Sequence, residues 1–245
     1  HVPTGQEPDG LLVFLGDLPP PDTDLWIARI TSNPRAEARA RRQNAAIPDG
    51  IMAGTLIETS NGARDVATLK PGDLVLTQDD GPQPLVQVAH QRISGARMRV
   101  DPQLRPVRIA AGALGEEVPH AELLVSFGHR VLLTGRRTRT LYSGNGVLVR
   151  AGDLLQLPGI SLALESTSAL YVSLVLAQHH LVNAVGLPVE SAHEHSSIAP
   201  GASRELRARF AKRQPASPGD PDGFGPPARR CLEPGEAAIL ATAFA

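Results

Sequence analysis

A histidine on a strand-like stretch is the clearest candidate for chemistry in this sequence. His129 lies in LLVSFGHRVLL, three residues after Ser126, and both follow an apolar run of strand length. An imidazole can pass a proton to a departing group near neutral pH, so this position suits a general acid. The alternative is a histidine at the end of a strand that only hydrogen-bonds to the backbone. The residues around it leave both interpretations open.

Other histidines and a single cysteine are the remaining reactive groups. His179-His180 and His193-Glu194-His195 gather imidazoles in short spans, and two histidines that alternate on a strand point to one face, as in zinc sites. Further ligands would have to come from His179 or Glu190, and no spacing demands this. We therefore predict solvated loop residues and no metal. Cys231 has no partner for an internal disulfide, and we interpret it as a small buried hydrophobe.

Short strands and turns are the elements that would position these side chains. TLIETSNGARDVATL contains Asn61-Gly62, a pair typical of tight hairpins, and Pro71-Gly72 marks another turn. Gly and Pro number 23 and 22 of 245 residues, which is dense punctuation for a helical protein. Because the strands follow one another too closely for crossover helices, the sequence predicts a mainly β, antiparallel fold.

Composition and charge exclude several classes of protein. A net charge of -1 argues against a nucleic-acid partner. No apolar run approaches the roughly 20 residues of a membrane helix, so we expect no membrane insertion. The first residues lack a basic-then-apolar signal pattern. We therefore expect either a cytoplasmic protein or one exported by a route that uses no signal peptide.

Several sequence blocks follow one another between Ile47 and Ser191. An opening G-T-x-I-x-T at Gly54, a hairpin and LKPGDLVLT come first, and RPVRIAAGALG, LLVSFGHRVLL and LYVSLVLAQHHLVNAVGLPVES follow. In this order the blocks resemble bacterial Hint domains, the fold shared by hedgehog autoprocessing domains and inteins. The resemblance implies a horseshoe-like all-β fold whose ends meet at a self-cleaving peptide bond.

The resemblance also implies an acyl shift, in which a side-chain thiol or hydroxyl attacks the carbonyl of the preceding peptide bond. Ser126 and His129 match the family's T/S-x-x-H element: Ser126 would hold the scissile amide, and His129 would protonate the departing nitrogen. The family's cysteine lies four residues before the Gly of G-T, and Gly50 stands there in this chain. The nucleophile position is therefore vacant. If His129 keeps its register, Gly50→Cys is expected to restore thioester formation.

The last block of the resemblance differs at its polar positions. Ser173 stands where related members carry a His, and Ala177 stands where an acidic residue is common. The family's Ala-Asn-Gly is Ala184-Val185-Gly186, whereas His179 matches a family histidine. Because turn and core positions fit while polar positions do not, the pattern predicts a fold kept without its reaction.

We accordingly predict a Hint-type domain that lacks the N–S acyl shift and acts as a structural or accessory domain, with no enzymatic activity and no cofactor. The alternative is residual self-cleavage near Gly50, with water as the attacking molecule and His129 as general acid. Asp49-Gly50 is also prone to succinimide formation, and we expect slow backbone damage there rather than evolved cleavage. No partner is defined, although related domains often accompany exported bacterial proteins, which makes secreted or surface proteins candidates.

The expected domain organisation has four parts. These are an N-terminal extension or linker over residues 1–46, a Hint core over 47–200, a loop-rich insertion over 201–230 and a closing strand over 231–245.

Overall fold

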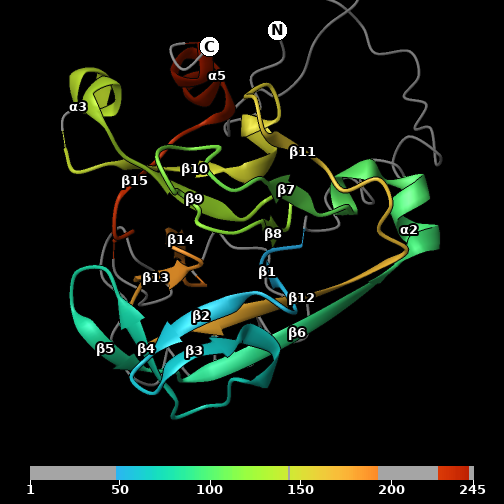
Figure 1. Cartoon of the computed structure of the whole chain (residues 1–245), viewed down its shortest axis with the longest axis vertical. Coiled ribbons are helices and arrows are strands. Elements are labelled where there is room, and N and C mark those ends of the chain that lie inside the picture. The colour runs from blue at the N-terminus through green and yellow to red at the C-terminus, as the bar shows by residue number, and fades with distance from the viewer. Residues whose placement is uncertain (1–47, 143, 193–225, 243–245) are drawn as a thin grey trace, which may run out of the picture. The chain divides into compact units, whose positions relative to one another are not determined.

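The structure, a computed structural model, describes residues 48–142, 144–192 and 226–242 (Figure 1). The chain divides into two units, His1–Gln43 and Asn44–Ala245, and every described residue belongs to the second. The predicted N-terminal extension and most of the predicted insertion, together with His193 and His195, lie outside the described residues.

One antiparallel sheet, in the order β11-β7-β8-β1-β12-β6, contains the start of the described chain. The short strand β1 pairs with β12 through Ile51 opposite Val172, and with β8 through Ile51 opposite Val125. It therefore joins two strands that are distant in sequence. The strands of this sheet are β1 (Ile51–Met52), β6 (Gln87–Ser94), β7 (Val107–Ile109), β8 (Leu123–Val125), β11 (Ile160–Leu162) and β12 (Ser168–Val175).

A second sheet has the order β15-β10-β9-β14-β13-β2-β4-β5, with β3 paired to β2. Its pairs are antiparallel except for β10 and β15, which run parallel. Its strands are β2 (Leu56–Thr59), β3 (Gly62–Asp65), β4 (Leu74–Thr77), β5 (Gly81–Pro84), β9 (Arg130–Leu133), β10 (Val147–Arg150), β13 (Leu181–Ala184), β14 (Leu187–Glu190) and β15 (Arg230–Cys231).

Helices among the described residues are short and connect or flank the strands (Figure 1). Because strands predominate over these short helices, the fold is mainly β, as the sequence predicted. The α-helices are α2 (Gly95–Val100), α3 (Arg136–Tyr142) and α5 (Pro234–Thr242), and the 3-10 helices are η1 (Val66–Thr68), η2 (Pro102–Leu104) and η3 (Ala151–Leu154).

Two tight hairpins show how local sequence sets the register. Thr59 lies opposite Gly62, so Ser60 and Asn61 form the turn predicted between β2 and β3. In the β13–β14 hairpin, the two turn residues Val185 and Gly186 have φ of +46° and +85°. Positive φ at both turn residues is the conformation that matches the twist of paired strands.

The core is built from aliphatic side chains of both sheets, as the scarcity of aromatic residues requires. Burial of one such side chain contributes roughly 1.5–3 kcal/mol, so the strands around the junction between β1, β8 and β12 are firmly anchored. Buried members on these three strands include Ile51, Leu123, Val125 and Val172.

The predicted closing strand is wrong over most of its length. Only Arg230–Cys231 is extended, and α5 covers Pro234–Thr242. Proline fits the first turn of a helix, and alanine and leucine favour its interior. Ala237 and Leu240, three residues apart, are both buried, as expected for one face of a helix.

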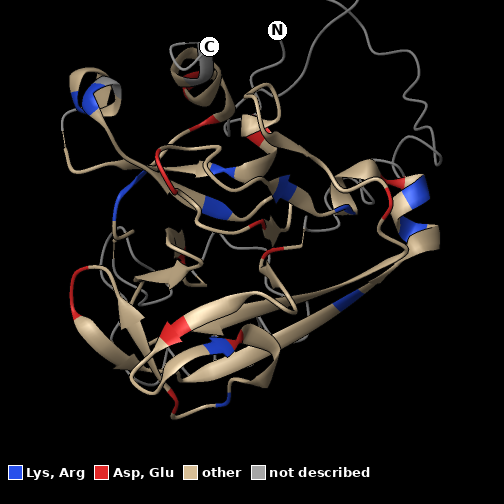
Figure 2. Ribbon diagram, in the orientation of Figure 1, with Lys and Arg blue, Asp and Glu red and all other residues tan. Residues whose placement is uncertain are grey.

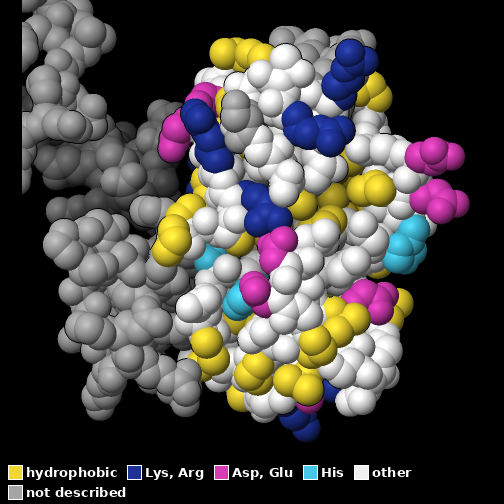
Figure 3. Space-filling model, turned by 90° about the vertical axis from the view of Figure 1, so that its left-hand side faces the viewer, with side chains coloured by type: hydrophobic (Ala, Val, Ile, Leu, Met, Phe, Trp, Pro, Cys, Tyr) yellow, Lys and Arg dark blue, Asp and Glu magenta, His cyan; other side chains and the backbone are white. Residues whose placement is uncertain are grey.

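The surface carries both signs of charge on the described elements (Figure 2). On the face shown in Figure 3, acidic, basic and hydrophobic side chains lie interspersed. Among the helices of the described segments, none is both long and apolar enough to cross a membrane.

Candidate active site

The peptide bond between Asp49 and Gly50 lies immediately before β1, where the chain enters the first sheet. Because β1 pairs with β8 and β12, residues of these two strands flank the bond. The Gly50 carbonyl accepts a hydrogen bond of 2.9 Å from the Ser126 N–H, which extends the β1–β8 pairing by one residue. The sheet itself therefore holds this bond in place.

Serine hydroxyls contact both sides of the Asp49–Gly50 peptide. Ser173 on β12 donates from Oγ to the Asp49 carbonyl oxygen at 2.6 Å. The Gly50 N–H donates to Ser126 Oγ at 3.1 Å. Both serines are buried, so water competes little for these bonds. A hydroxyl that donates to a carbonyl oxygen can also stabilise the negative charge that develops there when the carbon is attacked.

The contacts of Ser126 and Ser173 relate differently to the roles predicted for these two residues. Ser126 contacts the amide that the family resemblance assigns to it, and its part in a reaction stays a prediction. Ser173 was interpreted as an eroded position because it replaces a histidine. The structure instead places its hydroxyl on the carbonyl of the same peptide bond.

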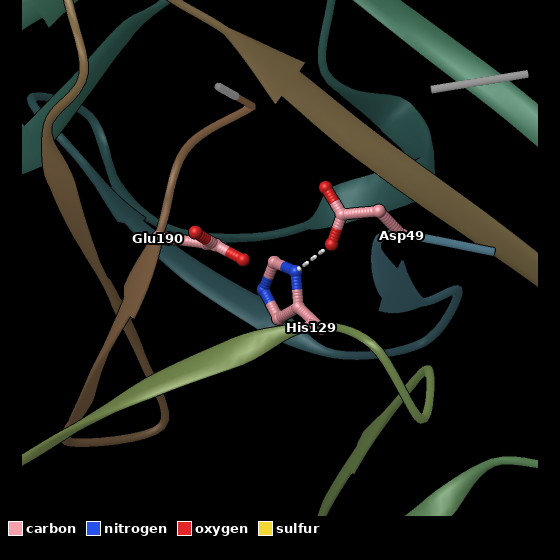
Figure 4. Close-up of side chains that lie close together, drawn as sticks. All are labelled: Asp49, His129 and Glu190. Atoms are coloured by element: carbon pink, nitrogen blue, oxygen red, sulfur yellow. Dashed lines mark hydrogen bonds and ion pairs between the residues drawn. The ribbon is translucent and has the colours of Figure 1, made fainter. Parts of the chain in front are cut away.

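His129 reaches the junction from the turn before β9. Its N–H donates to the Ser126 carbonyl at 3.2 Å, and this turn brings both side chains to one place. The His129 Nδ1 lies 2.7 Å from Oδ1 of Asp49 (Figure 4). An ionised carboxylate can only accept, so Nδ1 carries the proton in this pair. Both side chains are almost fully buried, at 3% and 4% exposure.

The pKa of His129 is set by opposing influences. Burial is the largest of them and disfavours the imidazolium, and the positive charge of Arg130 acts in the same direction. The charge of Asp49, its hydrogen bond and the charge of Glu190 together outweigh them, so the pKa of His129 lies above its usual 6.5. A raised pKa keeps more imidazolium at neutral pH, which is the form a general acid needs.

Glu190, at the end of β14, contacts Arg130 and His179. Its Oε1 accepts the Arg130 N–H at 2.9 Å, and its Oε2 lies 3.4 Å from Arg130 Nη1. The same Oε2 lies 3.6 Å from His179 Nε2. His179 Nδ1 accepts the Ala228 N–H at 3.0 Å, so the His179 proton resides on Nε2 and faces Glu190. The structure thus places His179 beside Glu190.

Asp49, His129 and Glu190 each offer a possible metal-ligand atom, and these atoms lie within 4.8 Å of one another (Figure 4). Carboxylate and imidazole donors would suit zinc or a similar ion. The two carboxylates also have partners within the protein, because Asp49 pairs with His129 and Glu190 pairs with Arg130. The same residues therefore also fit a buried network of ion pairs.

Gly50 stands where the sequence resemblance expects the family's nucleophile, and a side chain at this position would meet backbone atoms of a neighbouring strand. Its φ is +148°, a conformation that favours glycine. A Cβ at this position would lie 2.9 Å from the carbonyl oxygen of Val172 and 3.0 Å from its carbonyl carbon. These are backbone atoms of β12, which cannot move without disturbing its pairing with β1. The main chain of β12 thus fills the space that an attacking side chain would need.

The other reactive side chains, Cys231, His179 and His180, are partly or fully buried. Cys231 is half-buried against the cluster of Leu132, Leu148 and Leu181, and burial raises the pKa of its thiol. The prediction that His179 and His180 are solvated is wrong, because both are buried. They precede β13 at the edge of the core, and Nδ1 of His180 lies 3.2 Å from Asp80 Oδ2.

Two sheets, with a buried peptide bond at the start of β1 and a serine and a histidine of an S-x-x-H turn beside it, define a domain of the Hint type. A model of the Hint domain family matches residues 50–196, a span that begins at Gly50. The chain belongs to the Hint domain family, as the sequence resemblance indicated.

Solved structures of inteins match this chain at low sequence identity. The gp41-1 intein is 15% identical, and the match covers 57% of this chain and 96% of the intein, with a TM-score of 0.36. The bacterial intein-like domain from Clostridium thermocellum is 14% identical, with coverages of 59% and 99% and a TM-score of 0.37. A comparison with curated proteins found no match.

Proposed function

We propose that this Hint domain does not form an ester or thioester at Gly50 and instead cleaves the Asp49–Gly50 peptide bond of its own chain by slow hydrolysis. The observation that carries the proposal is the pair of buried serine contacts on that bond, at 2.6 Å to the carbonyl and 3.1 Å from the amide. These contacts orient and polarise the bond that the family's chemistry breaks. They therefore favour residual self-cleavage over a purely structural role.

Each group around the bond has a role in such a reaction. Ser173 would stabilise the oxyanion, a contribution that is worth about 10²–10³ in rate for one donor elsewhere. Ser126 would hold the amide so that its nitrogen departs in a fixed direction. His129 would protonate that nitrogen, which is necessary because an amide ion is a very poor leaving group.

A structural or accessory domain that performs no reaction is the second candidate. The closure of β12 over Gly50 favours it, because the main chain has taken the place of the nucleophile. The buried pairing of Glu190 with Arg130 also fits a junction that is a permanent part of the fold.

Intact mass spectrometry separates the two candidates. The chain would carry an N-terminal reporter and be incubated for days, with and without dithiothreitol. Self-cleavage yields fragments that end at Asp49 and begin at Gly50, at a rate that the thiol does not change and that His129→Ala abolishes. His120→Ala, at a histidine beside the β13–β14 turn, is the matched control and should cleave normally. A chain that stays intact would support the accessory role.

A further inference from the structure

We infer that the attacking group in this cleavage is the side-chain carboxylate of Asp49, one residue before the vacant nucleophile position, and that the reaction passes through a cyclic anhydride. The inference rests on the proposed self-cleavage and names its nucleophile. It replaces both a side chain at Gly50 and a water molecule as the group that first attacks the carbonyl.

The position of the Asp49 carboxylate is the first argument. Its side chain is 4% exposed, and His129 Nδ1–H donates to it at 2.7 Å. A buried aspartate beside an imidazolium is kept in its anionic, nucleophilic form by the opposite charge. Burial also removes the hydration shell that would weaken an oxyanion as a nucleophile in water.

Covalent connectivity is the second argument. An aspartate carboxylate oxygen closes a five-membered ring when it bonds to the carbonyl carbon of its own residue. Such an intramolecular attack needs no separate binding step, and well-oriented examples reach effective concentrations far above those of any bimolecular reactant. The carbonyl in question is the one that accepts the Ser173 hydroxyl, so the electrophile is already polarised.

The proposed reaction conserves atoms and charge at each step. A carboxylate oxygen of Asp49 bonds to the Asp49 carbonyl carbon, and the carbonyl oxygen takes the negative charge while Ser173 donates to it. The tetrahedral carbon then collapses, the C–N bond to Gly50 breaks, and the nitrogen takes the proton of the His129 imidazolium. The products are a five-membered anhydride at Asp49 and a free amine at Gly50. Water then opens the anhydride to two carboxylates, and a released proton returns to His129.

The hydrogen bond between His129 and Asp49 links these two events. As the carboxylate attacks, it loses the negative charge that holds the Nδ1 proton, so this hydrogen bond weakens. The proton is then free to move to the departing nitrogen at the moment when that nitrogen becomes basic. One imidazole thus holds the nucleophile before the attack and serves as acid after it.

A competing reaction starts from the same two residues. If the Gly50 nitrogen attacks the Asp49 side-chain carbon, a succinimide forms, one water is lost and the chain stays intact. This route requires the amide to give up its proton, and its N–H points at Ser126 Oγ, a hydroxyl that is not a base at neutral pH. Ser173 moreover polarises the main-chain carbonyl. The geometry therefore favours cleavage over succinimide formation.

Hydroxylamine opens an anhydride to a hydroxamate, which separates the anhydride route from direct attack by water. A succinimide would give the same hydroxamate, but it leaves the chain intact until hydroxylamine is added, so fragments that form without hydroxylamine exclude the succinimide route. The full chain is incubated at neutral pH with and without hydroxylamine, and the fragment ending at residue 49 is weighed. We expect that fragment to carry a hydroxamate when hydroxylamine is present, and we expect no intact species lighter by one water in its absence. Asp80–Gly81 is the internal control, because Asp80 also lies near an imidazole, that of His180, but in an exposed turn, and this bond should not be cut.

Two variants test the nucleophile directly. Asp49→Ala should slow cleavage by about 100-fold or more, because only water is left to attack. Asp49→Glu keeps the charge but must close a six-membered ring, so it should cleave more slowly than the native chain and still yield a hydroxamate. Thermal melting of each variant checks that it folds.

Each other outcome overturns the inference in a recognisable way. Cleavage without hydroxamate, at a rate unchanged in Asp49→Ala, would mean that water attacks directly, and self-cleavage itself would stand. Loss of one water that digestion locates in the Asp49–Gly50 peptide, or equal cutting at Asp80–Gly81, would mean ordinary Asp-Gly chemistry. A native chain that stays intact would overturn the inference and the proposed function together.

Discussion

The hydroxyl of Ser173 donates a hydrogen bond of 2.6 Å to the carbonyl oxygen of Asp49, across 124 residues of sequence. This contact joins β12 to the residue before β1 and lies on the bond that the proposed reaction breaks. Ser173→Ala should reduce the rate of self-cleavage by about 100-fold, because one oxyanion donor is lost. The buried carbonyl is left without its donor, so unfolding should also become easier by about 1–3 kcal/mol. Fragment accumulation and urea denaturation measure the two effects.

Ser191→Ala is the matched control for this prediction. Ser191 is fully buried, and its Oγ accepts the N–H of His180 at 2.9 Å. Its loss should cost a similar amount of stability and leave the cleavage rate within about twofold, since this bond does not touch the junction. If both variants slow cleavage equally, the effect of Ser173 is one of stability alone.

Substitutions at Gly50 test the closure of β12 over the nucleophile position. Gly50→Ala should lower the free energy of unfolding by at least about 2 kcal/mol, because it combines an unfavourable φ with a Cβ close to the Val172 backbone. Gly50→Cys should be destabilised in the same way and should give no cleavage triggered by dithiothreitol. This reverses the sequence-based expectation that a cysteine at this position restores a thioester.

Gly54 is the comparison that separates the cost of a positive φ from the cost of a close contact at Cβ. Its φ is +95°, and nothing lies within 4 Å of a Cβ built on it. Gly54→Ala should therefore carry only the backbone penalty, about 1 kcal/mol. Equal losses in the two alanine variants would show that Val172 yields, and the space at Gly50 would then be open to a side chain.

Much of the fold could be predicted because its signals are local. The Asn61-Gly62 turn, the strand-length apolar runs and the order of the family's blocks all lie within short windows of sequence. The last apolar segment was misassigned because a short apolar run is compatible with either a strand or a helix. At Val185 a non-glycine residue adopts φ of +46° with its side chain buried, so core packing there overrides the usual turn preference.

The site was only partly predictable, for a physical reason. Ser126 and His129 lie in one turn, and the S-x-x-H element of the family resemblance made both of them candidates. Asp49 contacts His129 across 80 residues, and Glu190 contacts Arg130 across 60. Such pairings depend on the packing of strands that no short window contains. The position of Asp49 directly before the vacant nucleophile position was the available signal, and it was interpreted only as a site of slow damage.

Glu190 should be one of the most sensitive charged positions in the described part of the chain. It is 1% exposed and pairs with Arg130, so Glu190→Gln leaves a largely buried cation without its counter-charge. We expect a loss of about 3 kcal/mol in stability, the usual cost of breaking a buried pair. Glu122→Gln removes one of the two carboxylate partners of Arg108, the other being Glu165, at an exposed site and should cost less than about 1 kcal/mol. Similar losses in both variants, measured by urea denaturation, would contradict a buried ion-pair network.

The pH dependence of stability follows from the raised pKa of His129. Folding strengthens proton binding at this residue, since Asp49 and Glu190 favour the imidazolium more than burial and Arg130 disfavour it. Its contribution to stability is therefore fully present below the unfolded pKa of about 6.5 and is lost as the pH rises through the higher folded value. The difference in unfolding free energy between the native chain and His129→Gln should accordingly shrink from pH 6 towards alkaline pH. Urea denaturation across this range measures it, and because both chains share every other titrating group, those contributions largely cancel.

The proton on His129 is also the one that the proposed reaction uses. The rate of self-cleavage should therefore depend on pH as well. Self-cleavage requires the His129 imidazolium to supply a proton to the Gly50 nitrogen, so its rate should fall about tenfold per pH unit once the pH exceeds the folded pKa of His129. Glu190→Gln removes one of the charges that raise this pKa, so the fall should begin at lower pH in that variant. An NMR titration of the imidazole supplies the pKa independently. A cleavage rate that rises with pH through this window would assign the proton transfer to another group and leave His129 as an ion-pair partner of Asp49.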